Sequence, residues 1–445
     1  MAYRTLDLDH AEEPIVNMSQ LDRVLIVAEH ASAKFGGEAI LPLHYYRVLR
    51  ARNVPVWLLV HERTREELTA LYPLDESHLL FVTDTWLHKS LWRVSQWMPT
   101  RLAGFTTGFA MRIATQLVQR RLIRELVEKE LITVIHQPMP VSPKEPSLLY
   151  GFGVPVVIGP MNGGMDYPPA FRQMQSRVEW FSLALGRASA NIMNRLIPGK
   201  RKAACLLVAN ERTKRALPSC VASTRCEVLV ENGVNLALWQ GSAKSARVAP
   251  PPSAVTHFVF MGRLVDWKAV DLLLSAFAHA AKSCSISLEI IGDGLERDSL
   301  EKFAKALKLS GSHRESGKVH FAGWLGQTEC ASYIRDADAL VLPSLMECGG
   351  AVVLEAMAMS LPVIATKWGG PVDYLDESCG ILVEPVSRVA LVAGLAAAML
   401  DLSSDPEKRI RMGLAARERV VKYFDWDVKV DIMMDVYRSV SATAS

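Results

Sequence analysis

Short apolar runs alternate with helical patterns in two successive series along this chain, and no other feature restricts its fold as strongly. The first series ends near Asn232, and the second begins at His257. The segment between them, residues 240–256, is rich in Ser, Ala and Pro, which is typical of a linker. Alternating strands and helices build parallel sheets, so we predict two doubly wound α/β domains, at residues 1–239 and 257–424.

The length supports the same division, because 445 residues exceed the size at which a single core stops growing. The expected strands are residues 23–28, 54–60, 131–135, 154–158, 204–210 and 226–230 in the first domain, and residues 257–261, 288–291, 319–321, 339–342 and 362–365 in the second.

Cysteine use and hydropathy indicate a cytoplasmic protein that is soluble or peripheral. Seven Cys are scattered without a C-x-x-C pair, which fits free, reduced thiols, with disulfides or a zinc site as the alternative. The first residues, MAYRTLDLDHAEEP, are acidic and polar, unlike a signal peptide. The longest uncharged run, residues 146–165, holds three Pro and five Gly, so it cannot form a spanning helix.

Basic residues gather in the first half. Residues 1–235 carry 28 Lys+Arg against 22 Asp+Glu, whereas residues 236–445 carry 22 against 25. Residues 86–129 combine eight basic residues with three Trp, as in helices that lie on an anionic membrane surface. The alternative is a solvated basic face with the aromatic rings in the core. No helix-turn-helix, zinc-finger or RNP signature is present, so we expect no nucleic-acid partner.

The second half contains a strand, a turn and a helix that carry two spaced carboxylates. Cys-Gly-Gly-Ala-Val-Val-Leu separates Glu347 from Glu355, and Gly349-Gly350 directly precede the helix. The free N–H groups at a helix N-terminus bind phosphate. Carboxylates placed there can accept bonds from sugar and ribose hydroxyls, and a buried carboxylate is costly without such donors. The alternative is an ordinary turn with two incidental acids.

Two cations follow the strand at residues 257–261. Gly262 ends this strand, and Arg263 and Lys268 lie five residues apart just before the next helix. At the C-terminal end of a parallel strand they can neutralise a diphosphate leaving group, Arg as a planar fork and Lys as a point charge. The alternative is a pair of surface cations.

These motifs resemble the donor domain of glycosyltransferase family 4. The matching segments are GRLVDWK (262–268), IIGDG (290–294), VHFAGW (319–324) and ECGGAVVLEAMA (347–358), together with Gly36-Gly37-Glu38 and Asn232-Gly233-Val234 in the first half. The resemblance covers nearly the whole chain. It implies a GT-B fold, in which two Rossmann-like domains face a central cleft and a C-terminal helix, here residues 425–445, returns to the first domain.

The resemblance also implies roles for single residues. Arg263 and Lys268 match the pair that binds the donor's diphosphate, Glu347 the acid that contacts the transferred sugar, and Glu355 the acid that contacts the ribose. Further expected donor-binding positions are Gly36, Gly37, Gly262, Gly292, Gly349, Gly350, Ala351 and Val352. Family members retain the anomeric configuration and usually need no divalent metal, and the two cations can take the role that Mg²⁺ has elsewhere.

Three positions depart from the family pattern. His136-Gln137-Pro138 stands where His-x-His is frequent, so His136 is a candidate catalytic residue with a core or turn histidine as the alternative. Ala269 replaces the usual Gly after Lys268. Cys348 follows the first Glu in place of the commoner Gly, and we expect a packed thiol rather than a nucleophile.

The loop GPMNGGMDYPP, residues 159–169, follows a strand that ends at the expected cleft. Asn162 and Asp166 are therefore candidates for binding acceptor hydroxyls. A glycine-rich loop that turns for backbone reasons alone is the alternative.

The sequence thus predicts a retaining, metal-independent transferase that moves a hexosyl-type sugar from a UDP- or GDP-sugar to an acceptor hydroxyl. The expected acceptor is a saccharide or a lipid-linked saccharide, as in bacterial exopolysaccharide, lipopolysaccharide or glycolipid assembly at the inner membrane face. The alternatives are a nucleotide-sugar epimerase and a non-catalytic nucleotide-sugar-binding scaffold. A dinucleotide dehydrogenase would need G-x-G-x-x-G after the first strand, which HASAKFGG does not supply.

Overall fold

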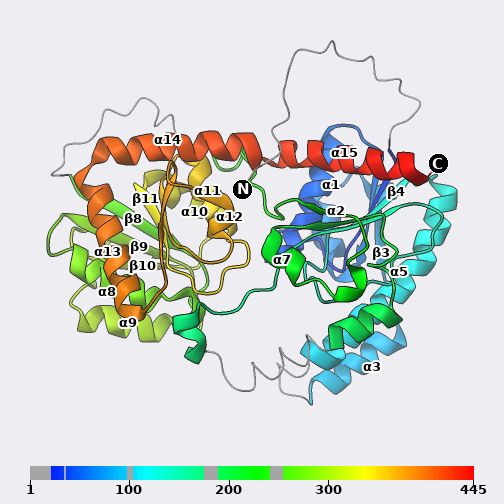
Figure 1. The fold of residues 1–445 in the computed structure, drawn as a ribbon, viewed down its shortest axis with the longest axis horizontal. Helices are drawn as coiled ribbons and strands as arrows, with labels where there is room; N and C mark the ends of the chain where they lie inside the picture. Colours follow the sequence, from blue (N-terminus) through cyan, green and yellow to red (C-terminus); the bar gives the residue numbers. More distant parts are fainter. Residues whose placement is uncertain (1–21, 35–36, 98–103, 175–188, 241–253, 445) are drawn as a thin grey trace, which may run out of the picture.

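The computed structural model describes residues 22–34, 37–97, 104–174, 189–240 and 254–444. Two α/β domains lie side by side, each built on a parallel sheet flanked by helices (Figure 1). The expected pair of doubly wound domains is therefore confirmed. Gly36, the N-terminal residues 1–21 and most of the expected linker (241–253) lie outside the described residues.

The first domain holds a sheet of seven parallel strands. They are β1 (Val24–Val27), β2 (Val56–His61), β3 (Leu79–Val82), β4 (Val134–Gln137), β5 (Val156–Met161), β6 (Cys205–Val208) and β7 (Cys226–Val228), in the spatial order β3-β2-β1-β4-β5-β6-β7. The helices are α1 (Leu41–Ala51), α2 (Arg65–Leu71), α3 (Trp86–Ser95), α5 (Phe109–Lys129) and α7 (Glu211–Arg215). Apolar side chains bury both faces of the sheet, as the continuous hydrophobic runs of its strands require.

The second domain holds a sheet of six parallel strands. They are β8 (Thr256–Met261), β9 (Ile286–Ile291), β10 (Val319–Gly323), β11 (Ala339–Leu342), β12 (Val363–Thr366) and β13 (Gly380–Val383), in the order β10-β9-β8-β11-β12-β13. The helices are α8 (Val270–Ala280), α9 (Arg297–Ala306), α10 (Gln327–Asp336), α11 (Ala351–Ala358), α12 (Pro371–Tyr374), α13 (Arg388–Ser404) and α14 (Pro406–Tyr423).

The last helix, α15 (Trp426–Ala444), packs on the first domain, as expected. It continues from α14 across the top of both domains (Figure 1). Its side chains Trp426, Val430 and Tyr437 join the core of the first sheet. Val234, in the segment that leaves the first domain, bridges Asp425, in the segment that returns to it. We call this paired crossing the hinge.

A segment of the expected first domain packs instead on the second. Tyr167 and Phe171 belong to the apolar core of the second domain, and residues 169–174 form a 3₁₀ helix. The Trp368 indole N–H donates to the backbone carbonyl of Asp166 at 2.9 Å. The loop after β5 thus reaches across the cleft.

The tryptophans of the basic stretch are exposed rather than buried. Trp86, Trp92 and Trp97 are 78%, 56% and 90% exposed, which contradicts the alternative that placed them in the core. They lie on and just after α3, at the lower edge of the first domain in Figure 1. In the described part, no single helix has the length and apolar character to span a bilayer. Taken together, α13 and α14 are long and apolar enough, but the chain bends by 104° between them.

Candidate active site

One of the two predicted cations, Lys268, and the first predicted carboxylate meet beyond the ends of β8 and β11. Arg263 follows β8 after Gly262 and is exposed, and Lys268 ends the 3₁₀ turn Asp266–Lys268. The Lys268 ammonium donates to a carboxylate oxygen of Glu347, and these two side chains are only 13% and 12% exposed. The structure thus brings together residues that are 79 positions apart in the sequence.

Glycines allow the ends of β8 and β9 to approach each other. A Cβ atom on Gly292, which has φ +140°, would lie 1.9 Å from the carbonyl oxygen of Gly262. No side chain fits there, so Gly292 is needed for the shape of the turn that follows β9. The neighbouring Ala269 adopts a left-handed conformation, φ 51° and ψ 38°, which explains why Gly is usual at this position.

Backbone bonds hold the loop that carries Glu347. The Leu345 N–H donates to the carbonyl of Trp267 at 2.8 Å, and the Gly370 N–H donates to the carbonyl of Glu347 at 2.7 Å. Gly350, with φ +85°, then starts α11, so that the N–H groups of Ala351 and Val352 stand at the helix N-terminus. The predicted phosphate-binding turn is therefore present in the fold.

Glu355 lies one turn further along α11 and is largely buried. Burial raises the pKa of its carboxyl from 4.5 to about 7. A carboxylate in so apolar a place gains most from a ligand that donates hydrogen bonds to it, as a ribose diol does.

The opposite wall of the cleft approaches the same loop. Gly37 opens the 3₁₀ helix Gly37–Ile40, and the neighbouring Glu38 is close enough to act on Cys348. Cys348 keeps exposed surface, but desolvation in the cleft, followed by the carboxylates of Glu231, Glu347 and Glu38, raises the pKa of its thiol to about 11. The thiol is therefore protonated at neutral pH, which does not suit a nucleophile, but Cys348 is exposed rather than packed as the sequence predicted.

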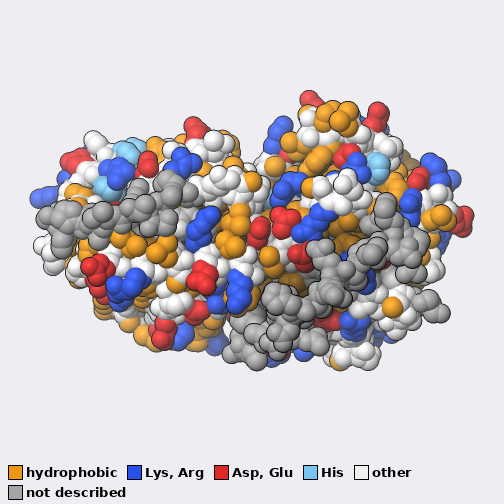
Figure 2. Space-filling model, turned by 90° about the horizontal axis from the view of Figure 1, so that it is seen from above, with side chains coloured by type: hydrophobic (Ala, Val, Ile, Leu, Met, Phe, Trp, Pro, Cys, Tyr) orange, Lys and Arg blue, Asp and Glu red, His pale blue; other side chains and the backbone are white. Residues whose placement is uncertain are grey.

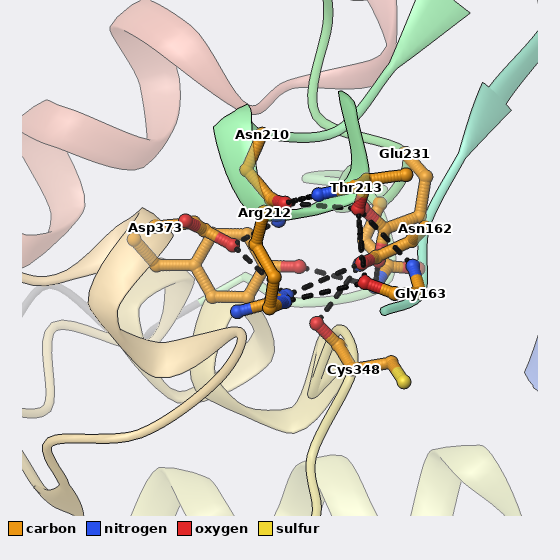
Figure 3. Close-up of polar contacts among 10 residues, drawn as sticks. Asn162, Gly163, Asn210, Arg212, Thr213, Glu231, Cys348 and Asp373 are labelled. Atoms are coloured by element: carbon orange, nitrogen blue, oxygen red, sulfur yellow. Dashed lines mark hydrogen bonds and ion pairs between the residues drawn. The ribbon is translucent and has the colours of Figure 1, made fainter. Parts of the chain in front are cut away.

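Asn162 bridges the two domains (Figure 3). Its side-chain amide donates to Glu231 Oε1 at 2.6 Å and to the backbone carbonyl of Cys348 at 2.8 Å. Its own oxygen accepts from Arg212 and Thr213, both at 3.3 Å. Only 5% of Asn162 is exposed. The structure therefore does not leave Asn162 free to bind acceptor hydroxyls, and this prediction from the sequence is wrong. Asn162 instead positions the loop between β11 and α11 that carries Glu347 and Cys348, which we call the donor loop.

A second cross-domain contact lies beside it. The amide of Asn210 donates to Asp373 Oδ2 at 2.7 Å, and the Arg212 guanidinium lies 3.8 Å from the same oxygen. Asp373 belongs to α12 of the second domain, and burial raises its pKa to about 6 even though Arg212 and Asn210 act in the opposite direction. These contacts join distant parts of the chain, and no local sequence pattern signals them.

A buried acid and a buried base lie at the hinge. Burial raises the pKa of Glu231 and lowers that of Lys429, which is on α15. The Lys429 ammonium donates to the carbonyl of Val230. A Cβ atom on Gly349 would lie 2.4 Å from Glu231 Oε1, so the donor loop packs directly on this acid. The sequence analysis did not single out Glu231. Its position directly before the predicted Asn232-Gly233 segment was a sequence signal that could have identified it.

His136 is a core residue. It is fully buried, its Nε2–H donates to the carbonyl of Gly159 at 2.7 Å, and its Nδ1 therefore accepts from the Tyr437 hydroxyl, also at 2.7 Å. Burial lowers its pKa to about 4, so it is neutral at pH 7. With both ring nitrogens engaged, His136 fits the core alternative and not the catalytic role proposed from the sequence.

A cavity of about 490 Å³ opens on the first-domain side of the cleft. Its charged lining consists of Lys144, Asp166, Arg212 and Arg215. Three cations against one acid make this cavity attractive to an anionic group. Figure 2 shows the molecule hollowed between its two halves, with acidic and basic side chains mixed along the junction. Asp166 therefore lies in a site that an acceptor can reach.

Comparison with known proteins finds a family model that is similar to part of this chain. Residues 244–419 match the family model of glycosyl transferases group 1. Over 240 residues, 51% of this chain and 54% of the relative, the chain is 30% identical to glycogen synthase of Mycobacterium tuberculosis. Over 189 residues, 42% of this chain and 51% of the relative, it is 31% identical to the lipopolysaccharide core biosynthesis glycosyltransferase LpsE of Rhizobium meliloti. The chain thus spans about half the length of the curated relatives it matches.

The likeness of the fold extends further. The crystal structure of Anabaena Alr3699/HepE in complex with UDP matches with a TM-score of 0.62 and 16% identity, over 94% of this chain and 100% of that chain. The fold is GT-B, as the resemblance implied. Within it, residues 244–419 are the part that matches the group 1 glycosyltransferase model, in line with the resemblance.

We predict that Asn162→Ala weakens donor binding, because the Cys348 carbonyl and Glu231 both lose a buried partner. The loss should also cost about 1–3 kcal/mol of stability. Donor affinity is measured by calorimetry, and stability by denaturant unfolding. Asn191→Ala is the matched control, because Asn191 lines the cavity without bridging the domains. Donor affinity equal to that of the wild type would refute the positioning role of Asn162.

Glu355→Gln should separate stability from donor binding. The pKa of Glu355 in the folded protein, about 7, exceeds its ordinary value of 4.5, so its ionisation destabilises the fold as pH rises through this window. The variant should gain on the order of 1 kcal/mol near pH 8 and nothing below about pH 4.5, and should bind donor more weakly. Melting curves and donor titrations at both pH values test this, with the exposed Glu377→Gln as control. A gain that does not change with pH would contradict it.

Proposed function

We propose that this protein is a retaining glycosyltransferase that uses a nucleoside-diphosphate sugar, UDP- or GDP-linked, and needs no divalent metal. The observation that carries the proposal is the contact between Lys268 and Glu347 beside the N-terminus of α11, with Arg263 exposed after the end of β8. Cations and helix N–H groups of this kind stabilise a departing diphosphate. The UDP in the crystal structure of the similar fold supports the choice of donor.

In the proposed reaction, the acceptor hydroxyl attacks the anomeric carbon on the face from which the diphosphate leaves. A new C–O bond forms to the acceptor, the bond between the anomeric carbon and the phosphate oxygen breaks, and the hydroxyl proton passes to the departing diphosphate. Arg263 and Lys268 neutralise the charge that develops on the phosphate oxygens. Closure of the two domains excludes water from the donor.

The acceptor site that we propose is the cavity beside Asp166. Its excess of cations suits a saccharide that carries phosphate or carboxylate groups, including a lipid-linked one. One relative, matched over about half of its length, is named for lipopolysaccharide core biosynthesis. This supports a role in bacterial surface-polysaccharide or glycolipid assembly.

We also propose that α3 brings the first domain to an anionic membrane. Three exposed Trp beside Lys89 and Arg93 give this region both an aromatic anchor and positive charge. A lipid-linked acceptor would then be presented at the same end of the molecule as the domain that binds it.

Arg263→Ala combined with Lys268→Ala should abolish sugar transfer, because the leaving diphosphate loses both of its cations. Nucleotide release from each of a panel of UDP-, GDP- and ADP-sugars is measured with and without acceptor. Lys302→Ala combined with Lys305→Ala, which removes two exposed cations of α9, is the control and should retain activity.

Turnover retained in the Arg263/Lys268 variant would overturn the assignment. An epimerised nucleotide sugar formed without acceptor would identify an epimerase instead. No thermal shift with any nucleotide would indicate a scaffold without donor binding.

Vesicle flotation tests the membrane proposal. The protein should float with anionic vesicles and not with neutral ones, and Trp86→Ser combined with Trp97→Ser should weaken binding by about tenfold or more, because two large apolar side chains are lost. Trp324→Ser is the matched control, since Trp324 is 77% exposed but belongs to the second domain. Absence of binding to either vesicle would remove the membrane from the proposal.

A further inference from the structure

A polar cluster interrupts the edge of the second sheet at a place where doubly wound sheets are apolar. Glu289 of β9 stands in register with His320 of the edge strand β10, so both side chains point to the same face. His313, from the segment between α9 and β10, reaches the same carboxylate. We propose that Glu289, His313 and His320 bind a divalent transition-metal ion of the Zn²⁺ type.

The geometry of the three side chains suits one ion. His313 Nδ1 lies 2.7 Å from Glu289 Oε2, and His320 Nδ1 lies 2.6 Å from Glu289 Oε1. The three potential ligand atoms all lie within 4.8 Å of one another. Metal–ligand bonds of about 2.0–2.2 Å place the ligands of one ion roughly 3.3 Å apart. Small rotations of exposed rings therefore bring the atoms to coordination distance.

The donor set selects the kind of metal. Two imidazole nitrogens and one carboxylate oxygen suit Zn²⁺ and neighbouring ions, whereas Mg²⁺ and Ca²⁺ take oxygen ligands. The Glu289 side chain is 9% exposed, but those of His320 and His313 are 34% and 45% exposed. The site is thus anchored in the sheet and open to solvent, which leaves room for water as a fourth ligand.

The surroundings hold the ligands in place. The ring of His313 meets Tyr333 of α10 edge to face at 5.2 Å. On the same sheet face, His257 Nδ1 lies 2.6 Å from Ser287 Oγ. Burial, and then Arg314, lowers the pKa of His257 to about 4, so this imidazole is neutral at pH 7 and adds no positive charge to the site. Figure 2 shows histidine side chains gathered on the surface of the second-domain half.

The position of the cluster points to a structural or regulatory ion. Glu289 lies three residues before Gly292, which begins the turn after β9. This separation corresponds to about 10 Å of extended strand. The segment that carries His313 covers the edge strand, where the Val319 N–H donates to Leu309 and the Gly311 N–H to Val319. An ion held by all three ligands would fasten this cover to β9 and β10. The inference therefore goes beyond the proposed function and does not depend on it.

Metal titration of the full-length protein tests the site. The protein is stripped with EDTA, dialysed and titrated with Zn²⁺, Co²⁺ or Mg²⁺ in a calorimeter. We expect one Zn²⁺ per chain at this site, a visible Co²⁺ absorption band, no Mg²⁺ binding here, and a higher melting temperature with Zn²⁺. His313→Ala, His320→Ala and Glu289→Gln should each weaken Zn²⁺ binding by about 100-fold or more, since loss of a second-shell partner alone costs about 10–100-fold.

Glu289→Gln keeps the shape of the side chain, so a loss of binding in this variant cannot be ascribed to unfolding. His279→Ala, which removes an exposed imidazole of α8, is the matched control and should bind Zn²⁺ like the wild type. No Zn²⁺ binding by the wild type, or equal binding by all the ligand variants, would show a hydrogen-bonded network only and overturn the proposal. Sugar transfer is not the readout, so failure of the proposed function leaves this test intact.

Discussion

One side-chain amide, that of Asn162, holds the two halves of the cleft in register. It donates hydrogen bonds to Glu231 at the hinge and to the Cys348 carbonyl in the donor loop, and its oxygen accepts a hydrogen bond from Arg212. Each of these groups is at least partly buried, so water cannot freely replace a lost hydrogen-bond partner. Loss of one partner therefore lowers the free energy of unfolding by about 1–3 kcal/mol. The position of the Glu347 loop therefore depends on a residue of the other domain. Donor and acceptor sides are connected before any ligand binds.

A second connection between distant parts of the chain lies at the hinge. The Val234 N–H donates to the Phe424 carbonyl at 2.8 Å, so the two strands of chain that cross between the domains support each other. Gly233 permits the close approach, because a Cβ there would lie 3.0 Å from the same carbonyl. Glu231 and Lys429 lie buried beside this point, and burial raises the pKa of Glu231 and lowers that of Lys429.

Much of this structure could be predicted from the sequence, and the exceptions have physical reasons. The alternation of apolar runs predicted both sheets, but β3 and β13 were missed, because four-residue apolar runs such as those of Leu79–Val82 and Gly380–Val383 do not distinguish strand from helix. Lys268 and Glu347 meet as predicted, because parallel strands end on the same side of a sheet. His136 and Asn162 were misjudged, because their partners, Tyr437 and Cys348, lie 301 and 186 residues away.

The ion pair between Lys268 and Glu347 gives the donor site a definite state without ligand. Both side chains are nearly buried, and each satisfies the charge of the other. In the proposed reaction the diphosphate competes for Lys268, which frees the Glu347 carboxylate to accept hydroxyls of the transferred sugar. Binding of the diphosphate and of the sugar is then coupled through one bond. A nucleotide without its sugar would take Lys268 and leave Glu347 desolvated and unpaired, which is unfavourable. The same contact that orders the empty site would therefore favour the complete donor over the free nucleotide.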